Sequence, residues 1–175
     1  LDLLVELAPQ LRRVALLGER ENHNFQGFSR VFEPTARAIG IEPIIAPAHE
    51  AADVSAVIDT LSTGAPAGLI VSASGFSVVH RALIERLAAE AGLPAIYWNR
   101  NFPQSGGLMS YGPNFRDMNR QSATYISAIL KGARPAEMPV QAAVRYELIV
   151  NTTVAGRLGL AVPPRLLAIV DDFVE

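Results

Sequence analysis

Side chains that could perform acid–base, nucleophilic or metal chemistry are few in this sequence and poorly spaced for it. The 175 residues include three histidines, and no two of them stand four residues apart, so the spacing gives a metal site little support. There is no cysteine, which excludes thiolate nucleophiles, disulfides and cysteine-bound metals. We therefore predict no catalytic residue, no metal ligand and no cofactor.

The motifs of acyl transfer and nucleotide binding are also missing. The run Ser72-Ala73-Ser74-Gly75 does not match the G-x-S-x-G nucleophile elbow. The first loop contains Gly18 and Gly27 without a dinucleotide or Walker pattern. His23 and His49 are weak candidates for ligand contacts, and the acidic pair Asp171 and Asp172 is expected on a solvated helix face.

Neutral hydrogen-bonding groups and aromatic rings follow the ends of three expected strands. Amides and hydroxyls orient a polar solute, and aromatic rings bury its apolar part. Arg100 is the best candidate for pairing with an anionic group, because its guanidinium offers a planar fork of donors. The alternatives are that the Asn and Ser residues only cap helices and that Arg100 stacks on Phe102. The candidate ligand-binding residues are Asn22, Asn24, Ser72, Ser74, Phe76, Asn99 and Arg100.

The elements that must position these residues alternate along the first hundred positions. Short apolar runs predict strands at 14–18, 44–46, 68–71 and 94–98, and helical spacing predicts helices at 2–8, 25–39, 54–61 and 79–88. The runs are continuous rather than alternating, which is typical of a parallel sheet covered by helices on both faces. The expected fold class is therefore α/β, with a Rossmann-like parallel sheet flanked by helices.

The strand–helix alternation stops after Asn99. We expect a loop at 100–106, a short extended segment at 108–111, a helix at 114–130, an extended segment at 139–150 and short helices at 152–158 and 163–173. One long helix and two strands cannot form a stable sheet of their own. We therefore divide the chain into residues 1–105, a Rossmann-like lobe, and residues 106–175, which resemble half of another unit.

The composition narrows the classes of partner. Half of the residues are hydrophobic and 18% are charged, which excludes a disordered chain. The net charge of −2 gives no basic surface for nucleic acid or for an anionic membrane. No apolar run approaches the length of a transmembrane helix, and no signal peptide is visible.

Several segments resemble one family over nearly the whole chain, most specifically at 93–167. They are LPAIY at 93–97, GGLMSYG at 106–112, ATY at 123–125, ILKGARP at 129–135, YELIVN at 146–151 and VPPRLL at 162–167. This series is similar to the tryptophan/tyrosine-binding (TrpX-like) group of ABC-transporter substrate-binding proteins.

The resemblance implies a type I periplasmic-binding fold, in which two Rossmann-like lobes close on a solute. This chain would be the carboxyl-terminal part, with residues 108–111 and about 145–150 as crossings between lobes and residues 114–133 as a helix of the other lobe. The implied partners are a small, amino-acid-like solute and an ABC permease, in the periplasm or cell envelope. A ligand-sensing or regulatory domain of the same fold is the alternative. Apolar residues of the 114–130 helix, with an open edge at 108–111, suggest self-association.

Overall fold

The alternation of strands and helices produces a single sheet with its helices on two faces. The computed structural model describes residues 1–142 and 145–175. Its strands are β1 (Arg13–Glu19), β2 (Glu42–Ala48), β3 (Ala67–Val71), β4 (Ala95–Tyr97), β5 (Met109–Pro113), β6 (Tyr146–Asn151) and β7 (Asp172–Val174). Its α-helices are α1 (Asp2–Leu7), α2 (His23–Ala38), α3 (Ala51–Leu61), α4 (Gly75–Val79), α5 (Arg81–Glu90), α6 (Asn101–Ser105), α7 (Phe115–Leu130), α8 (Thr152–Arg157) and α9 (Pro164–Leu167).

The sheet order is β2-β1-β3-β4-β5-β6-β7, and β1 to β5 run parallel. This confirms the predicted α/β class. The strand β2 is longer than predicted and contains Pro43 and Pro47. Proline cannot donate to a neighbouring strand, and it is tolerated here because β2 lies at the edge of the sheet.

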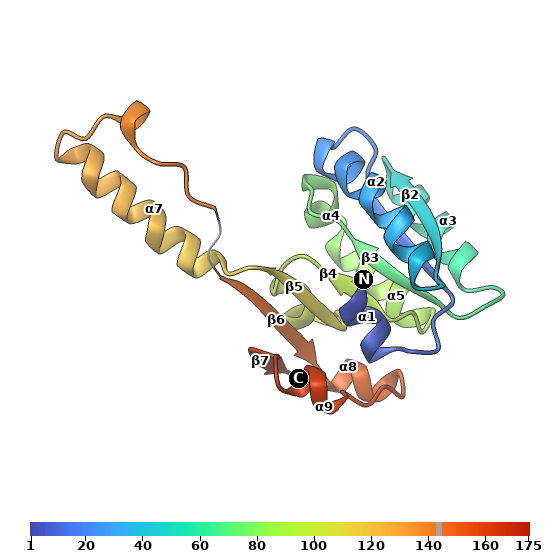
Figure 1. Ribbon diagram of the computed structural model, residues 1–175. Helices are drawn as coiled ribbons and strands as arrows, with labels where there is room; N and C mark the ends of the chain where they lie inside the picture. Colours follow the sequence, from blue (N-terminus) through green and yellow to red (C-terminus); the bar gives the residue numbers. More distant parts are fainter. Residues whose placement is uncertain (143–144) are drawn as a thin grey trace.

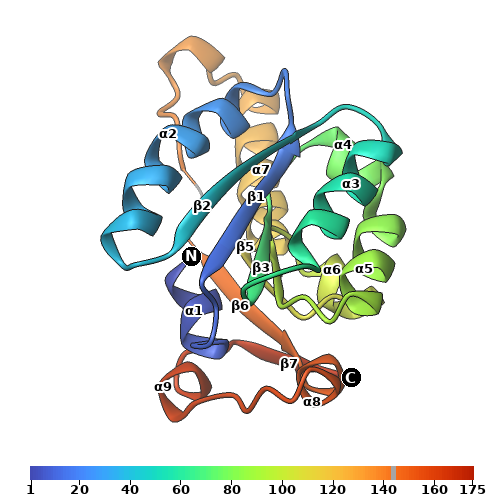
Figure 2. The ribbon, with the colours of Figure 1, turned by 90° about the vertical axis from the view of Figure 1, so that its right-hand side faces the viewer.

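Two hydrophobic clusters cover the two faces of the sheet. Figure 2 shows α2 and α1 on one side of the strands and α3 to α6 on the other. The α3–α6 side is closely filled, with Leu69, Ile84 and Phe102 almost completely buried. The cluster on the other side draws on α1, α2, α8 and α9 and includes Leu4, Leu16 and Leu166. Phe28 and Val31 of α2 are 56% and 66% exposed, so this face of the sheet is less completely covered than the other.

The carboxyl-terminal part of the chain extends the same sheet. The strand β5 pairs with β4 through Met109 and Ser110, and β6 returns antiparallel along the whole of β5. The expectation of an open edge at 108–111 is therefore wrong for Met109 and Ser110, because both of their sides are paired. The part of the extended segment that falls on residues 143–144 lies outside the described residues.

Three local expectations for this region and the helix before it are corrected. The predicted loop at 100–106 contains the short helix α6, because the buried ring of Phe102 anchors it. The helix predicted at 79–88 begins earlier, as α4, and is interrupted at His80 before α5. The last predicted helix ends at Leu167, and the chain then forms β7 beside β6.

Helix α7 projects away from the sheet, as Figure 1 shows. Its first turn is capped by Asn114, whose side chain accepts a hydrogen bond from the Asp117 amide. None of the residues in α7 is buried, and Ile126, Ile129 and Leu130 are 58%, 42% and 82% exposed. An exposed apolar stripe of this kind is typical of a surface that packs on another unit.

We expect the 175-residue chain to self-associate through this stripe of α7. Light scattering should give a mass above 18.8 kDa that rises with concentration. Replacing Ile129 and Leu130 with lysine should return the mass to that of a monomer, since both side chains are exposed and their removal costs the fold little. A chain that is monomeric at every concentration would contradict the prediction.

A buried carboxyl group links α5 and α6. Glu85 is 7% exposed and accepts a hydrogen bond from the Ser105 hydroxyl at 2.7 Å. Burial raises the pKa of Glu85 above its ordinary value, although the Ser105 hydrogen bond opposes that shift. The folded state therefore holds this proton more tightly than the unfolded state does.

The Glu85→Gln variant should consequently change how stability depends on pH. In the parent protein, the contribution of Glu85 is most favourable below the unfolded pKa and is lost as the pH rises through the raised folded pKa. Glutamine keeps an acceptor for Ser105 and does not ionise. Urea unfolding between pH 4 and pH 8 should show the variant gaining stability relative to the parent as the pH rises. Parallel curves would contradict the prediction.

Candidate functional site

The carboxyl ends of the parallel strands form one edge of the sheet, here called the carboxyl edge. It consists of the loops that follow β1, β3 and β4, residues 20–22, 72–74 and 98–100. The strand β1 lies between β2 and β3, and the connection that leaves β1 (α2) and the one that leaves β3 (α4 and α5) lie on opposite faces of the sheet. Open α/β sheets bind ligands in the crevice at such a switch point. A ligand is therefore expected to bind at the ends of β1 and β3.

The end of β1 is shaped by a close approach at Gly18. A Cβ atom at this position would collide with the Phe25 ring and with the Ser72 hydroxyl. Asn22 caps α2, since its side-chain oxygen accepts hydrogen bonds from the amides of Asn24 (2.9 Å) and Phe25 (3.2 Å). Asn22 thus has the capping role weighed from the sequence. Asn24 is exposed, and its side chain has no hydrogen-bond partner among the described residues.

The end of β3 carries a buried hydroxyl without a partner. Ser72 is 5% exposed, and its Oγ has no hydrogen-bond partner in the described part of the chain. Ser74 is the N-cap of α4, and its hydroxyl accepts a hydrogen bond from the Ser77 amide at 3.1 Å. Phe76 is 8% exposed and contacts the His80 ring at 4.5 Å. A buried donor left free at a strand end is a group that a ligand could satisfy.

Trp98 and Ser77 connect the ends of β3 and β4, and neither is among the ligand-binding residues predicted from the sequence. The Trp98 indole donates a hydrogen bond to the Ser77 hydroxyl at 3.1 Å. Its ring also makes edge contacts with Phe102 at 6.3 Å and Phe115 at 6.0 Å. The sequence predicts Trp98 inside the fourth strand, whereas β4 ends at Tyr97. A strand one residue shorter would have put this aromatic ring on the carboxyl edge.

Arg100 lies between two carboxylates of the chain itself. Its guanidinium contacts Glu147 at 3.2 Å and Asp172 at 2.8 Å, and Asn114 donates a second hydrogen bond to Glu147 at 2.7 Å. The two terminal nitrogens of Arg100 are therefore paired within the chain, whereas its Nε is buried without a hydrogen-bond partner among the described residues. Asn99 accepts a hydrogen bond from the Asn101 amide at the start of α6.

The acidic pair near the end of the chain is bound rather than free on a helix face. Asp171 accepts hydrogen bonds from the Leu148 amide at 2.9 Å and from Arg145 at 3.1 Å, and these contacts lower the pKa of its carboxyl group. Asp172 is the first residue of β7 and pairs with Arg100. The expectation of a solvated helix face is therefore wrong for both residues.

The surroundings of His23 and His49 do not support a role in ligand or metal binding at this edge. His49 follows β2 and His23 begins α2, and both are exposed. Asp53 serves in the capping box of α3, where the amides of His49 and Glu50 lower the pKa of its carboxyl group. Over residues 1–142 and 145–175, no three potential ligands among His, Cys, Asp and Glu lie close enough to hold a metal ion.

An open apolar groove begins at the carboxyl edge and continues along the less covered face. We call it the α2 groove. It encloses about 620 Å³, and its lining includes Phe28 and Val31 of α2, Ile70 of β3, Ile96 of β4 and Trp98 on the carboxyl edge. Ser72 also lines it, so the free hydroxyl and the groove are contiguous.

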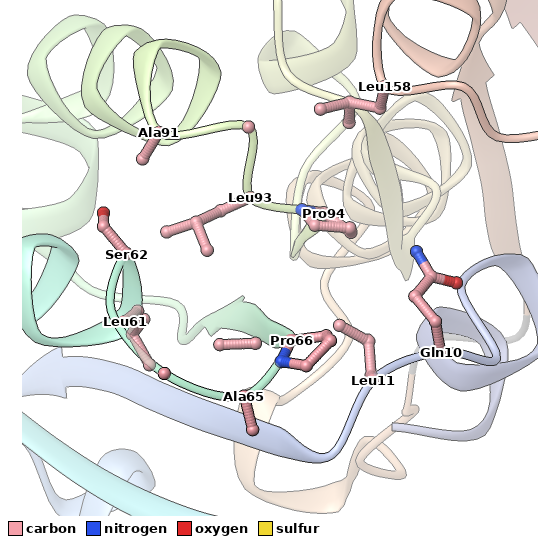
Figure 3. Close-up of a pocket in the computed structure, with 13 residues that line it drawn as sticks. Gln10, Leu11, Leu61, Ser62, Ala65, Pro66, Ala91, Leu93, Pro94 and Leu158 are labelled. Atoms are coloured by element: carbon pink, nitrogen blue, oxygen red, sulfur yellow. The ribbon is translucent and has the colours of Figure 1, made fainter.

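A smaller pocket lies at the opposite edge of the sheet. It encloses about 200 Å³ between Leu11, Pro66 and Pro94, at the amino ends of the strands, as Figure 3 shows. None of the candidate ligand residues contributes to it, and the polar side chains that line it are those of Gln10 and Ser62.

Among the helices that the structure describes, none combines the length and apolarity needed to span a membrane.

Comparison with solved structures supports the fold. A conserved domain protein from Vibrio cholerae O1 biovar El Tor aligns over 98% of this chain and 58% of its own, with 22% identity and a TM-score of 0.85. The ABC domain from Streptococcus pneumonia in complex with L-Trp aligns over 99% and 60%, with 17% identity and a TM-score of 0.86. A substrate-binding protein with adhesive properties from Clostridium difficile, in its ligand-free, open form, aligns over 99% and 58%, with 19% identity and a TM-score of 0.72.

The chain therefore spans about three fifths of the length of these structures. No curated protein matched it. A family model, described as ABC transporter substrate binding protein, matches residues 1–174. Since the match covers almost every residue, and the structural neighbours have the same α/β sheet, the chain belongs to the ABC transporter substrate-binding protein family.

Proposed function

We propose that the chain is the carboxyl-terminal part of the solute-binding component of an ABC importer. It would capture a small polar or amino-acid-like solute at the carboxyl edge, without catalysis, and deliver it to a permease from the periplasm or cell envelope. The observation that carries this proposal is the Ser72 hydroxyl, buried without a partner at the switch point of the sheet. Trp98 and Asn24 lie on the same edge and supply an aromatic ring and a free amide.

The domain arrangement follows as part of the same proposal. Residues 1–105 would form the carboxyl-terminal lobe, and within 106–175 the strands β5 and β6 would be the crossings to a second lobe. Helix α7, which has no buried residue, would pack on that lobe. The neighbour that contains L-Trp makes an aromatic amino acid the first solute to test. A ligand-sensing domain would use the same edge.

Amide chemical-shift mapping tests the site directly. We expect L-Trp, or another member of a panel of amino acids, to shift the amide signals of residues 20–24, 72–77 and 98–101. Shifts confined to the opposite edge, around Pro66 and Pro94, would overturn the assignment. A complete absence of shifts across the panel at millimolar concentration would count against an amino-acid solute.

The Asn24→Ala variant separates binding from capping. The Asn24 side chain has no partner among the described residues, so its removal should leave the unfolding temperature unchanged. If the amide contacts the solute, calorimetry should show affinity weakened by about 1 kcal/mol. Gln10→Ala, an exposed amide at the opposite edge of the sheet, is the matched control and should bind as the parent does. Equal affinity in all three proteins would exclude Asn24.

Arg100 requires a different comparison, because it already pairs with Glu147 and Asp172. We retain it as a candidate contact for an anionic solute group. Arg100→Ala should weaken solute binding by about 1–3 kcal/mol if that contact exists. Asp172→Asn removes one of its competing carboxylates and should then strengthen binding. Unchanged affinity in both variants would assign Arg100 to the fold alone.

A further inference from the structure

A polar pocket borders the carboxyl edge beside α6 and the start of α7, and we call it the α6–α7 pocket. It encloses about 400 Å³, a size typical of sites for small molecules. The loop after β4 and helix α6 contribute Asn99, Arg100, Asn101 and Gln104 to its lining. Helix α7 contributes Phe115, Arg116 and Asn119. Ser72 does not line this pocket, which is therefore distinct from the polar end of the α2 groove.

Amide side chains dominate the lining of the α6–α7 pocket. The Asn99 carbonyl oxygen accepts a hydrogen bond from the Asn101 backbone amide at 2.8 Å, which leaves the NH₂ group of Asn99 for a ligand. The side chains of Asn101, Gln104 and Asn119 are exposed and have no hydrogen-bond partner among the described residues. Each amide offers both a donor and an acceptor, and a hydroxyl group can use both. The pocket therefore matches a ligand with several hydroxyl groups.

Arg116 gives the pocket its positive charge. It is exposed, and its guanidinium forms no ion pair with a carboxylate of the described residues. Arg100 already pairs with Glu147 and Asp172. Since none of the described residues that line the pocket is Asp or Glu, an ammonium group finds no ionic partner among them. A carboxylate, in contrast, can form a bidentate pair with Arg116.

One buried carboxylate fixes both parts of the pocket. Glu147 is 7% exposed and accepts hydrogen bonds from Arg100 at 3.2 Å and from Asn114 at 2.7 Å. Arg100 is the N-cap residue of α6, and Asn114 is the N-cap residue of α7. Glu147 therefore holds the starts of both helices in place. A site that is fixed before its ligand arrives loses less conformational entropy on binding.

We propose that the α6–α7 pocket binds a small polyhydroxylated carboxylate, such as a sugar acid. Arg116 pairs with the carboxylate, and the amides of Asn101, Gln104 and Asn119 bond to the hydroxyl groups. The ring of Phe115, which is 37% exposed, supplies apolar surface for the carbon chain. This site goes beyond the solute site proposed at the ends of β1 and β3, and it does not depend on Ser72.

Probes with the same carbon chain length test the chemistry of the ligand. D-gluconate carries a carboxylate and hydroxyl groups, D-glucitol carries hydroxyl groups alone, and hexanoate carries a carboxylate alone. We expect D-gluconate to shift the amide signals of residues 101–104 and 116–119. Its affinity, measured from those signals, should be at least about tenfold higher than that of either partial probe. Equal affinity of D-glucitol or hexanoate, or no shift at 116–119, would overturn the proposal.

A matched pair of charge variants tests the role of Arg116. Arg116→Gln should weaken D-gluconate binding about tenfold and leave the unfolding temperature unchanged, because the side chain is exposed. Arg157→Gln removes the same charge from the exposed surface of α8 and should bind as the parent does. Equal weakening in both variants would show an effect of net charge only and would overturn the proposal. Shifts caused by L-Trp at residues 72–77 report on the other site, so the two proposals can fail separately.

Discussion

Replacing Gly112 with alanine should destabilise the protein by about 3 kcal/mol, in the upper range for a residue forced into a packed site. A Cβ atom at Gly112 would collide with the carbonyl oxygen of Trp98 and lie 2.9 Å from its carbonyl carbon. Both are backbone atoms, so rotation of a side chain cannot relieve the contact. The end of β5 must therefore move away from the loop after β4.

Chemical denaturation of the parent and Gly112→Ala proteins measures this loss. Gly27→Ala is the matched control, because Gly27 lies in α2 and no heavy atom stands within 4 Å of an added Cβ. Alanine there should stabilise the helix by about 0.5–1 kcal/mol. If Gly112→Ala unfolds at the same denaturant concentration as the parent, the close approach of β5 to Trp98 is wrong.

The second large effect is expected for Glu147→Ala. The Glu147 side chain is 7% exposed and accepts hydrogen bonds from Arg100 and Asn114. Its removal leaves the partly buried Arg100 with only the exposed Asp172 as a charge partner. Removing one member of a buried ion pair typically costs about 3–5 kcal/mol, since the other charge remains desolvated. Urea unfolding should show a loss in this range.

A double-mutant cycle distinguishes the ion pair from simple loss of volume. Arg100→Ala and Glu147→Ala should each be strongly destabilising, while the double variant should be much less destabilised than their sum. Glu147→Gln keeps an acceptor for Asn114 and should fall between the parent and Glu147→Ala. Additive losses would show that Arg100 and Glu147 do not stabilise one another.

The parallel strands and their helices could be predicted because each is specified by a pattern within a short stretch of sequence. The runs at 14–18 and 68–71 are apolar throughout, and each is followed by a helical pattern that ends at a glycine. Gly40, Gly64 and Gly92 have positive φ angles, as expected of residues that end a helix. In this region the strands and helices predicted from the spacing of apolar residues are those that the structure contains.

The short elements near the end of the chain could not be predicted in this way. The strand β7 has only three residues, and its place beside β6 depends on contacts with distant partners. Asp171 binds the Leu148 amide and Asp172 binds Arg100, across 23 and 72 positions of sequence. Contacts of that range leave no periodic signal, so a helical pattern through 163–173 was the wrong interpretation.

The sequence predicted that the candidate site lies at the carboxyl edge of the sheet, but it did not predict the hydrogen bonds and ion pairs of the side chains there. The strand ends correctly placed Ser72, Asn22 and Asn99 on loops of the carboxyl edge. The sequence could not show that Asn22 is occupied by capping or that Arg100 is held by Glu147. Both roles depend on which polar groups lie within hydrogen-bonding distance of each side chain in the folded protein, and tertiary packing determines those neighbours.

The antiparallel pairing of β5 and β6 has a mechanical consequence for α7. The two strands are bonded along their whole length, from Met109 with Val150 to Pro113 with Tyr146, and the rings of Tyr111 and Tyr146 stack at 5.6 Å. A ribbon of two bonded strands is stiff within its own plane and compliant perpendicular to it. We therefore expect α7 to move relative to the sheet mainly by bending of the β5–β6 ribbon perpendicular to its plane.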